Sequence, residues 1–264
     1  MKTGFLAMDA IEAFDRDGYI VVENLLDAQE IMLLGTIARR DHALAASRTS
    51  RADGEGGSVD LVVENELPSD SIYSAIVQAE PLVSAMEYLL GDEVYHYHHK
   101  MILKEPRVGG AWTWHQDYGY WYNNGCLFPD MASCMFAVDQ ATKKNGCLQV
   151  LRGSHRMGRI DHIKRGDQTG ADMERVNAAL QRMDLVHVEM TPGSAVLFHG
   201  NTLHRYDQNI SEIPRWAFIC CYNTRSNNPY KEGRHPLYSL LHRVTADEVV
   251  LIGRRHLQIL SDEN

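Results

Sequence analysis

Hydrophobic and polar residues alternate differently in the first third of the chain than in the rest. Up to about residue 92, apolar residues recur at helical spacing between polar caps and glycines. Residues 8–18 form one such helical segment, and residues 19–26 then read as a strand. Asp27 followed by Glu30 is an acidic variant of the capping box, which predicts that the next helix begins there.

The remainder of this first third contains a polar stretch and two more predicted helices. Residues 47–60 are the most polar and glycine-rich part of the chain, which is typical of a mobile loop. Ser69 or Asp70 is placed to cap one helix, and Pro81 starts another that Gly91 ends.

From about residue 93 the chain consists of short strand-like runs. They are rich in β-branched and aromatic residues and are bounded by Gly, Pro and Asn. These runs cover residues 93–104, 110–117, 132–140, 146–155, 184–190, 193–200 and 215–225. One helix is predicted at 172–183, and Thr245 caps a last one. The pattern predicts a mainly β fold, a double-stranded β-helix or jelly roll, with the N-terminal helices packed on one outer face.

The 264 residues fit one domain of enzyme size. We expect a single domain over residues 1–264, with a mostly helical part at 1–92, a jelly-roll core at 93–225 and a C-terminal extension at 226–264. A net charge of -9 argues against a nucleic-acid partner. The basic cluster Arg254–His256 is interpreted as a solvated helix surface.

Nothing in the sequence predicts membrane insertion or secretion. Acidic residues interrupt the N-terminal apolar stretch too early for a signal peptide, and no window approaches the ~18 apolar residues that span a bilayer. The five cysteines form no CxxC pair and are odd in number. Reduced thiols and a cytoplasmic location are therefore expected. The sequence does not indicate an oligomeric state.

The segment around His115 and Asp117 carries the strongest chemical signal. In an extended strand residues i and i+2 point to the same face, so these two side chains project together while Gln116 turns away. One imidazole and one carboxylate are two thirds of the 2-His-1-carboxylate triad that binds non-heme Fe(II). Trp112 and Trp114 precede the pair, and an aromatic run follows it.

The chain holds 13 histidines, and most of them are read as surface or core residues. His96, His98 and His99 form the main decoy: His96 and His98 share a strand face, but no carboxylate lies two positions from either. His155 follows a turn-forming Gly-Ser pair and reads as a turn or cap residue. The competing distal ligands are His199 and His204.

His204 is preferred because Arg215 follows it by eleven residues at the start of another apolar strand. In a jelly roll, two strands joined by a loop of this length place both side chains in the same barrel mouth. A buried guanidinium requires an anion, and its planar fork suits a carboxylate. Alone, Arg215 would read as a surface residue; with the metal residues it reads as the anchor of a dicarboxylate cosubstrate.

The order of these motifs resembles the phytanoyl-CoA dioxygenase family of Fe(II)- and 2-oxoglutarate-dependent oxygenases. His115-x-Asp117, residues 145–155, and His204 with Arg215 carry the resemblance, together with the lead-in at 14–26. It implies His115, Asp117 and His204 as iron ligands and Arg215 as partner of 2-oxoglutarate. It also implies that Met101 lines the cosubstrate pocket.

Two positions depart from the family pattern. Many members have a small hydroxyl residue two positions after the distal histidine, where this chain has Tyr206, whose phenol can still donate a hydrogen bond to the cosubstrate. Some members have a tryptophan at the position of Met135. Because Asp117 is present, the halogenase branch, which replaces the carboxylate by a small residue, is disfavoured.

The resemblance implies an enzyme that uses Fe(II), 2-oxoglutarate and O2 to hydroxylate an aliphatic carbon of a small molecule, releasing succinate and CO2. Tyr118, Tyr120 and Trp121 are predicted to wall the substrate pocket, with residues 47–60 and 123–130 as lids. Desaturation or cyclisation at the same site, and a non-catalytic metal-binding or sensor protein, are the alternatives. The acidic chain weakly disfavours a CoA ester, and the substrate is not otherwise identified.

Overall fold

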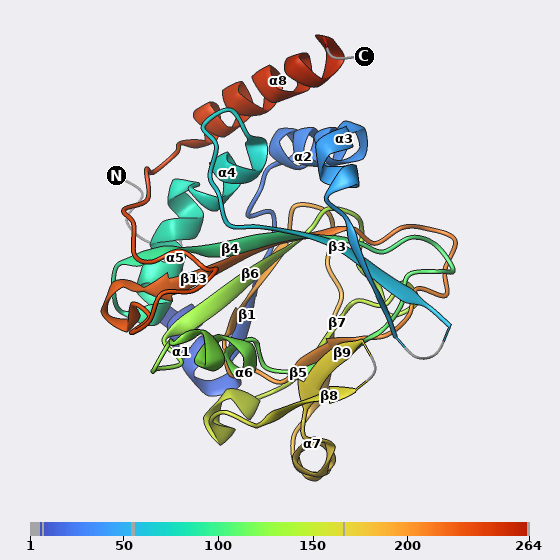
Figure 1. Cartoon of the computed structure of the whole chain (residues 1–264), viewed down its shortest axis with the longest axis vertical. Helices are drawn as coiled ribbons and strands as arrows, with labels where there is room; N and C mark the ends of the chain where they lie inside the picture. The colour runs from blue at the N-terminus through green and yellow to red at the C-terminus, as the bar shows by residue number, and fades with distance from the viewer. Residues whose placement is uncertain (1–5, 7, 54–55, 166, 263–264) are drawn as a thin grey trace.

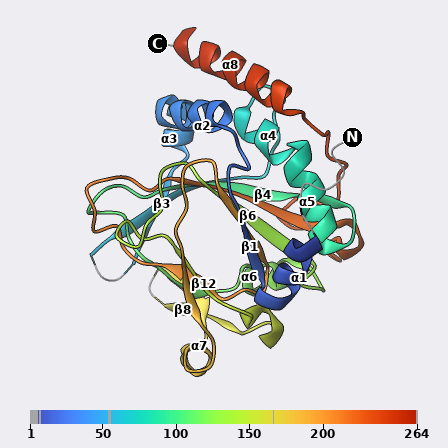
Figure 2. The same ribbon diagram turned by 180° about the vertical axis from the view of Figure 1, so that it is seen from behind.

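The computed structural model describes residues 6, 8–53, 56–165 and 167–262. Two antiparallel sheets face each other, and most helices cover the outer face of the larger sheet (Figures 1 and 2). This is the predicted jelly roll with helices on one outer face, and the prediction of the fold class is confirmed.

The large sheet has seven strands in the order β1-β11-β6-β13-β4-β3-β2, and the small sheet has four in the order β10-β7-β12-β5. A separate hairpin consists of β8 and β9. The strands are β1 (Tyr19–Val22), β2 (Thr49–Ala52), β3 (Ser58–Glu64), β4 (Val94–Leu103), β5 (Trp112–His115), β6 (Met131–Ala137), β7 (Leu148–Leu151), β8 (His162–Arg165), β9 (Gln168–Ala171), β10 (Leu185–Val188), β11 (Ala195–His199), β12 (His204–Tyr206) and β13 (Ala217–Thr224).

The helices flank these sheets. They are α1 (Met8–Asp17), α2 (Ala28–Arg40), α3 (His42–Ala46), α4 (Ile72–Val77), α5 (Glu80–Leu90), α6 (Asp117–Trp121), α7 (Met173–Leu180) and α8 (Ala246–Asp262), with 3-10 turns at Tyr122–Asn124, Ser154–Met157 and Arg225–Asn227. None of the described helices is long and apolar enough to cross a membrane.

The large sheet is buried on both faces at its centre. Every residue of β6 and β13 is buried, as a strand covered on both sides requires. Phe218 and Cys220 join the core beneath the helices, whereas Ile219 and Cys221 join the core between the two sheets. Alternate residues of one strand therefore serve two separate cores.

Local signals fix several helix ends as expected. Asp27 and Glu30 form the predicted capping box at the start of α2. Gly91 adopts a left-handed conformation (φ 71°) after α5, which a glycine tolerates without strain. Thr245 exchanges hydrogen bonds with Glu248 at the start of α8.

The polar stretch at 47–60 is the main error of the fold prediction. Instead of a loop, its described residues contain β2 and the start of β3, which pair as a hairpin and extend the large sheet through β4. β2 is exposed along its whole length, so its polar composition reflects an edge position. The part of this stretch at residues 54–55 lies outside the described residues.

Two smaller predictions also need correction. Helix α4 is preceded by Ser71, which makes no side-chain cap hydrogen bond, so neither Ser69 nor Asp70 is its cap. The cluster Arg254–His256 lies on α8 with both arginines exposed, but the His256 ring packs edge-on against Tyr73 at 5.7 Å and is only partly exposed. It is therefore not wholly a solvated surface.

Candidate active site

Two adjacent strands and one short helix position the predicted metal ligands. β5 ends at His115, Gln116 remains extended, and Asp117 is the first residue of α6. β12 begins at His204, which pairs with His115 across the antiparallel ladder. The prediction that His115 and Asp117 share one strand is wrong, because the chain turns into a helix after Gln116. The turn nevertheless brings the carboxylate toward the imidazole.

Gln116 points away from this group, as predicted, and fixes the turn. Its amide nitrogen donates to the carbonyls of Gly158 and Asn201, and its amide oxygen accepts from the backbone of Ile160. Its own backbone N–H donates to Nε2 of His162. These bonds tie the start of α6 to two distant segments, residues 158–162 and Asn201.

His115, Asp117 and His204 converge. One ligand atom from each lies within 4.8 Å of the others, and all three side chains are buried. Nε2 of His115 is 3.9 Å from Oδ1 of Asp117, and the two imidazole centroids are 4.0 Å apart. Within the described residues this is the one group of three such side chains close enough to hold a metal ion.

Hydrogen bonds select the atoms that face the centre of this group. Nδ1 of His115 bonds the Thr113 carbonyl and Nδ1 of His204 bonds the Thr202 carbonyl, each at 2.9 Å. A carbonyl can only accept, so both Nδ1 atoms carry the proton and both Nε2 atoms keep a free lone pair. Ser133 donates to Oδ2 of Asp117 at 2.6 Å, leaving Oδ1 available. The donor set is two neutral nitrogens and one carboxylate oxygen, which fits Fe(II).

The electrostatics agree with neutral imidazoles. Burial, and then the proximity of His204, hold the pKa of His115 well below its usual value. Burial also lowers the pKa of His204, although Asp117 opposes this shift. An imidazole must be neutral to bind a metal.

A lysine lies beside the same group. Nζ of Lys100 is 4.0 Å from Oδ1 of Asp117. Burial acts to lower the pKa of Lys100, but Asp117 and Cys221 outweigh it, and the net shift is upward. Lys100 is therefore a fixed positive charge next to the carboxylate.

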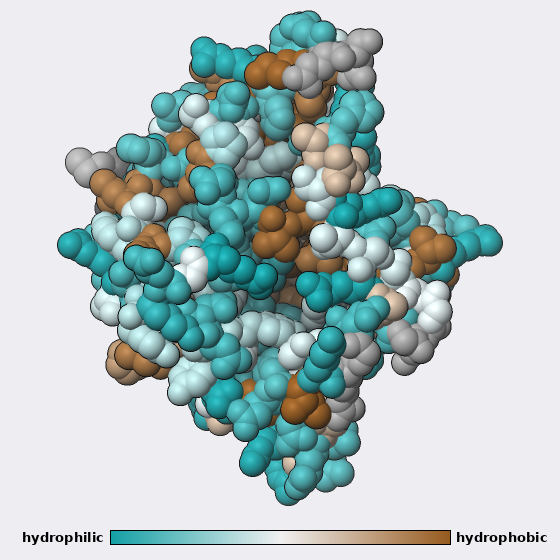
Figure 3. Space-filling model, in the orientation of Figure 1, coloured by the Kyte–Doolittle hydropathy of each residue, from teal (hydrophilic) through white to brown (hydrophobic). Residues whose placement is uncertain are grey.

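The three side chains line a narrow cavity of about 70 Å³ between the two sheets. The face of the molecule seen in Figure 3 is hollowed near its middle, and apolar residues lie beside the hollow. The cavity is lined by Leu61, Lys100, Ile102, Trp112, His115, Asp117, Tyr120, Met135, Leu148, Phe198, His204, Tyr206 and Ile219. Its walls are mostly apolar, with the polar atoms gathered around Asp117.

Of the three aromatic residues predicted to wall the pocket, only Tyr120 lines this cavity. The hydroxyl of Tyr118 donates to the Leu127 carbonyl at 2.6 Å, and its ring belongs to the core. Trp121 packs edge-on against Tyr97 with centroids 5.5 Å apart. The predictions for Tyr118 and Trp121 are therefore wrong: the helical turn of α6 directs both rings into the core.

Arg215 lies just before β13 and is completely buried. None of its three guanidinium nitrogens has a hydrogen-bond partner within the described part of the chain. Its guanidinium carbon is 4.8 Å from the ring centroid of Tyr206, a residue of the cavity wall. A buried cation without an anion is costly, so the arrangement is incomplete until an anion binds.

Lys104 lies on the same side of the site. Its Nζ is 4.3 Å from the centroid of the Tyr206 ring, and it donates to the Asp207 carbonyl. Burial, and then the nearby Arg215, lower the pKa of Lys104 to about 5. The Tyr206 ring is thus flanked by two buried basic side chains.

Met101 does not lie in this cavity. It is buried in the core beneath the helices, on the opposite face of β4 from Lys100 and Ile102. The prediction that Met101 contacts the cosubstrate is wrong, because adjacent residues of a strand point to opposite faces.

The cluster of His96, His98 and His99 is structural, but its geometry differs from the prediction. The pairing of β4 with β13 is irregular at Tyr97. Cys221 of β13 pairs with His98 and the next residue, Tyr222, pairs with His96, so Tyr97 is an extra residue on β4. His96 bonds His99 at 3.1 Å, whereas the His98 ring contacts Trp121 at 6.0 Å. The bulge therefore separates His96 and His98, and the expectation that they share a face is wrong.

The structure distinguishes between the two competing distal histidines. His199 packs against Phe14 and His155 and accepts a hydrogen bond from the backbone of Asn201. His204 is the histidine that joins His115 and Asp117. His155 lies in a 3-10 turn, as its sequence context predicts.

Sequence reasoning missed Lys100, Lys104 and Ser133. The spacing of Lys100 and Ile102 on one strand face was available as a signal for Lys100. Ser133 carried no such signal, because its hydrogen bond to Asp117 depends on how β6 lies against the start of α6.

These observations define a class: a jelly roll with two histidines and one carboxylate placed to hold a metal, and with a buried arginine beside Tyr206 of the same cavity. The model of the phytanoyl-CoA dioxygenase family matches residues 14–217. The chain belongs to this family.

Individual relatives agree with that assignment. L-proline trans-4-hydroxylase of Streptomyces griseoviridis is 27% identical, covering 87% of this chain and 91% of the relative. Ectoine dioxygenase of Sphingopyxis alaskensis is 30% identical, covering 81% of this chain and 75% of the relative.

Solved structures show the same fold. EctD from S. alaskensis, crystallised with 2-oxoglutarate and 5-hydroxyectoine, superposes with a TM-score of 0.78 at 24% identity, over 93% of this chain and 89% of that one. The carbocyclase SnoK of nogalamycin biosynthesis gives a TM-score of 0.69 at 18% identity, over 89% of this chain and 97% of that one.

The protein is therefore an Fe(II)- and 2-oxoglutarate-dependent dioxygenase. The predictions of the family, the enzyme class and the use of iron, 2-oxoglutarate and O2 are confirmed.

Proposed function

We propose that the protein hydroxylates an aliphatic carbon of a small amino acid or amino-acid derivative, with Fe(II) held by His115, Asp117 and His204 and 2-oxoglutarate held by Arg215. The observation that carries the proposal is the buried guanidinium of Arg215, whose nitrogens lack partners among the described residues and which packs on Tyr206, a wall residue of the cavity that holds the three candidate metal ligands. Bound iron and 2-oxoglutarate supply O2 activation, with release of succinate and CO2.

The chain's own residues hold and orient these groups. The carbonyls of Thr113 and Thr202 fix the two imidazole tautomers, and Ser133 leaves one oxygen of Asp117 free. We assign no residue a role as general acid or base, because bound iron and 2-oxoglutarate would carry out the oxidation.

Arg215 would pair with the distal carboxylate of 2-oxoglutarate through two parallel hydrogen bonds. The ring of Tyr206 packs on the guanidinium of Arg215. The carboxylate of 2-oxoglutarate would therefore reach the guanidinium past the edge of the Tyr206 ring, or would displace the ring. The Tyr206 phenol and Lys104 are the further contacts that we assign to the cosubstrate.

Three observations favour a small amino-acid-like substrate. Lys100 offers a positive charge to a substrate carboxylate beside the metal donors. The remaining walls are mostly apolar and would contact a short aliphatic or cyclic body. The two relatives named above act on proline and on ectoine, both of this size. Neither nucleic acid nor a membrane is a partner in this proposal.

A cytoplasmic location is consistent with the thiols. All five cysteines are free and buried. Burial raises the pKa of Cys126 and Cys147 to about 11 and that of Cys221 to about 12, which keeps these thiols protonated and unreactive.

The test is a substrate panel with the full chain, Fe(II), 2-oxoglutarate and isotopically labelled O2. It contains proline, its ring homologue, ectoine and a long-chain acyl-CoA. We expect succinate release coupled to one of the small substrates, with one labelled oxygen atom gained by the product. Asp117→Ala should abolish coupled turnover, while Asp184→Asn, at an exposed carboxylate paired with Arg152, should not.

Other outcomes would overturn particular parts of this proposal. A product that has lost two hydrogens without gaining oxygen would assign desaturation or cyclisation instead. Turnover of the acyl-CoA alone would reject the substrate class. Absence of succinate release together with absence of 2-oxoglutarate binding would favour a non-catalytic metal-binding protein.

A further inference from the structure

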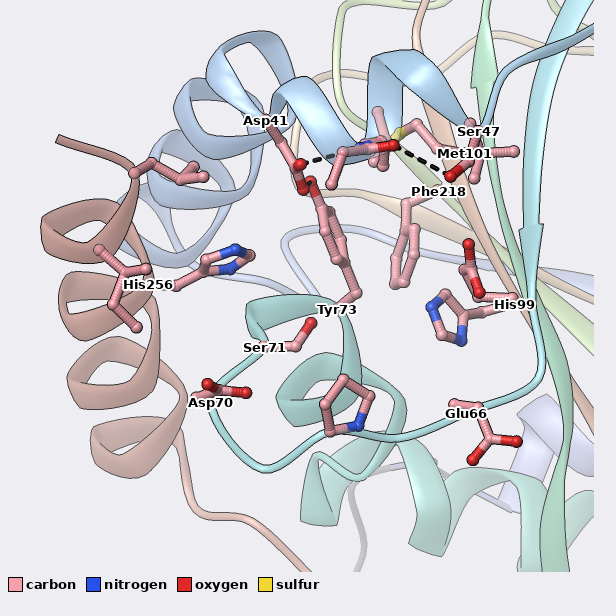
Figure 4. A pocket seen from close by; sticks show the side chains of 17 residues that line it. Asp41, Ser47, Glu66, Asp70, Ser71, Tyr73, His99, Met101, Phe218 and His256 are labelled. Atoms are coloured by element: carbon pink, nitrogen blue, oxygen red, sulfur yellow. Dashed lines mark hydrogen bonds between the residues drawn. The ribbon is translucent and has the colours of Figure 1, made fainter. Parts of the chain in front are cut away.

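A second and larger cavity lies on the other face of the large sheet. Its volume is about 350 Å³, within the range of about 300–1,000 Å³ typical of small-molecule sites. It lies between the sheet and helices α3, α4 and α8 (Figures 1 and 4). β4 contributes Met101 to this cavity and the adjacent Lys100 and Ile102 to the active site. The sheet therefore separates the two sites, and a ligand in the outer cavity cannot reach the metal.

Aromatic side chains form the wall of this outer cavity. Tyr73 and Phe218 have ring centroids 5.9 Å apart, and His99 lies 5.5 Å from Phe218. Tyr73 also meets the His256 ring at 5.7 Å. Met101 lies beside this group (Figure 4). These rings are largely buried, Phe218 fully and Tyr73 and His99 at 8% and 5% exposed, while Pro68 and Ile259 complete the apolar lining with exposed side chains. A lining of this kind binds apolar bodies, and an aromatic ring also attracts cations through its π electrons.

In the described part of the chain, the carboxylates around the cavity are not balanced by a lysine or an arginine. Asp41, Glu64, Glu66 and Asp70 line it, and no lysine or arginine among the described residues does. Asp41 accepts a hydrogen bond from Tyr73 at 3.1 Å and caps α3. Glu64, Glu66 and Asp70 are exposed and form no ion pair with a described residue. Three carboxylates are thus available to a ligand.

His99 supplies a further polar atom. Its side chain is only 5% exposed, and its Nδ1 bonds Nε2 of His96 at 3.1 Å. Its own Nε2 has no hydrogen-bond partner in the described part of the chain, although the residue lines the cavity. Burial lowers the pKa of His99 to about 4, so the ring is neutral at pH 7 and adds no positive charge.

We propose that this outer cavity binds a small organic cation, an ammonium compound with an aromatic or aliphatic body. The apolar and aromatic lining would contact the body of the ligand, and the carboxylates at the rim would pair with its ammonium group. An anion or a zwitterion fits less well, because no lysine or arginine among the described residues lines the cavity. This site is independent of the proposed reaction.

The test uses three probes of similar size: phenethylammonium, neutral phenethyl alcohol and anionic phenylpropionate. Each is titrated calorimetrically into the full chain loaded with Fe(II) and 2-oxoglutarate under anaerobic conditions. We expect phenethylammonium to bind in the millimolar range or tighter, the alcohol to bind at least about threefold more weakly, and the anion not to bind.

Matched variants locate the bound cation. In Glu64→Gln/Glu66→Gln, the loss of two exposed charge contacts should weaken phenethylammonium binding by about three- to tenfold. Glu12→Gln/Glu174→Gln makes the same change in net charge at exposed positions that do not line the cavity, and should leave binding unchanged. Succinate release serves as a check that both variants are folded.

Four results would overturn the proposal: no binding of the cation, equal binding of the alcohol, binding that is unchanged in Glu64→Gln/Glu66→Gln, or an equal loss in the control variant. Binding of a lysine-rich peptide without binding of phenethylammonium would also overturn it and would identify this face as a protein-docking surface.

Discussion

Arg215 is the residue whose environment says most about ligand binding. A guanidinium that is fully buried without an anion destabilises the ligand-free protein, and a carboxylate that reaches it gains two charge-assisted hydrogen bonds. In its proposed role, the same residue raises the free energy of the ligand-free protein and strengthens cosubstrate binding.

We predict opposite effects of Arg215→Met on stability and on binding. The 2-oxoglutarate-free protein should become as stable as the wild type or more so, because a buried unpaired charge is removed. The Kd for 2-oxoglutarate should rise by at least about thirtyfold, as expected for loss of a buried charge partner. Thermal unfolding with and without 2-oxoglutarate measures both.

Arg225→Met is the matched control, since Arg225 is an exposed arginine paired with Glu93. It should leave the Kd unchanged. An Arg215→Met variant that binds 2-oxoglutarate as tightly as the wild type would remove Arg215 from the cosubstrate site.

At the scale of single residues, the sequence predicted which side chains the fold brings together: His115, Asp117 and His204 converge, and Arg215 lies beside Tyr206 of the same cavity. His115, Asp117, His204 and Arg215 are separated by known spacings, and each residue type has a specific chemical use. Lys104 could not be identified in this way, because its burial beside Tyr206 depends on how β4 and β12 approach each other.

The element that most affects the metal donors is the short helix α6. Its first residue is Asp117, and Gly119 in the same turn lies against His162. A Cβ at Gly119 would stand 1.9 Å from Cε1 of His162, so a larger residue must displace the histidine or the helix. His162 in turn accepts a hydrogen bond from the backbone of Gln116.

We therefore predict that Gly119→Ala weakens Fe(II) binding by about tenfold and destabilises the protein by about 1–3 kcal/mol through overpacking. Anaerobic Fe(II) titration and chemical denaturation measure these effects. Gly35→Ala, in the interior of α2, is the control and should not change Fe(II) affinity. Unchanged Fe(II) binding in Gly119→Ala would show that α6 does not fix the position of Asp117.

The sequence predicted elements well where local signals were strong and failed where pairing decided the outcome. The capping box at Asp27 and the glycine at the end of α5 act within one turn. The hairpin of β2 and β3 was read as a loop, because its composition is polar and its strand state comes from pairing with β4. The same applies to the bulge that separates His96 from His98.

At the scale of the whole molecule, one sheet serves two cavities of different chemistry. Strands β3, β4 and β13 present alternate residues to the metal site and to the outer cavity beneath the helices. The jelly roll and its helical cover were predictable from the hydrophobic pattern. The outer cavity was not, because it depends on the packing of α3, α4 and α8, which lie far apart in the sequence.

The most direct test of the metal site is the visible charge-transfer absorption that appears when 2-oxoglutarate chelates Fe(II) under anaerobic conditions. We predict this band for the wild type and for His199→Ala, and its loss in His115→Ala and His204→Ala. If His204→Ala kept the band with unchanged 2-oxoglutarate affinity while His199→Ala lost it, the assignment of the iron ligands would be contradicted.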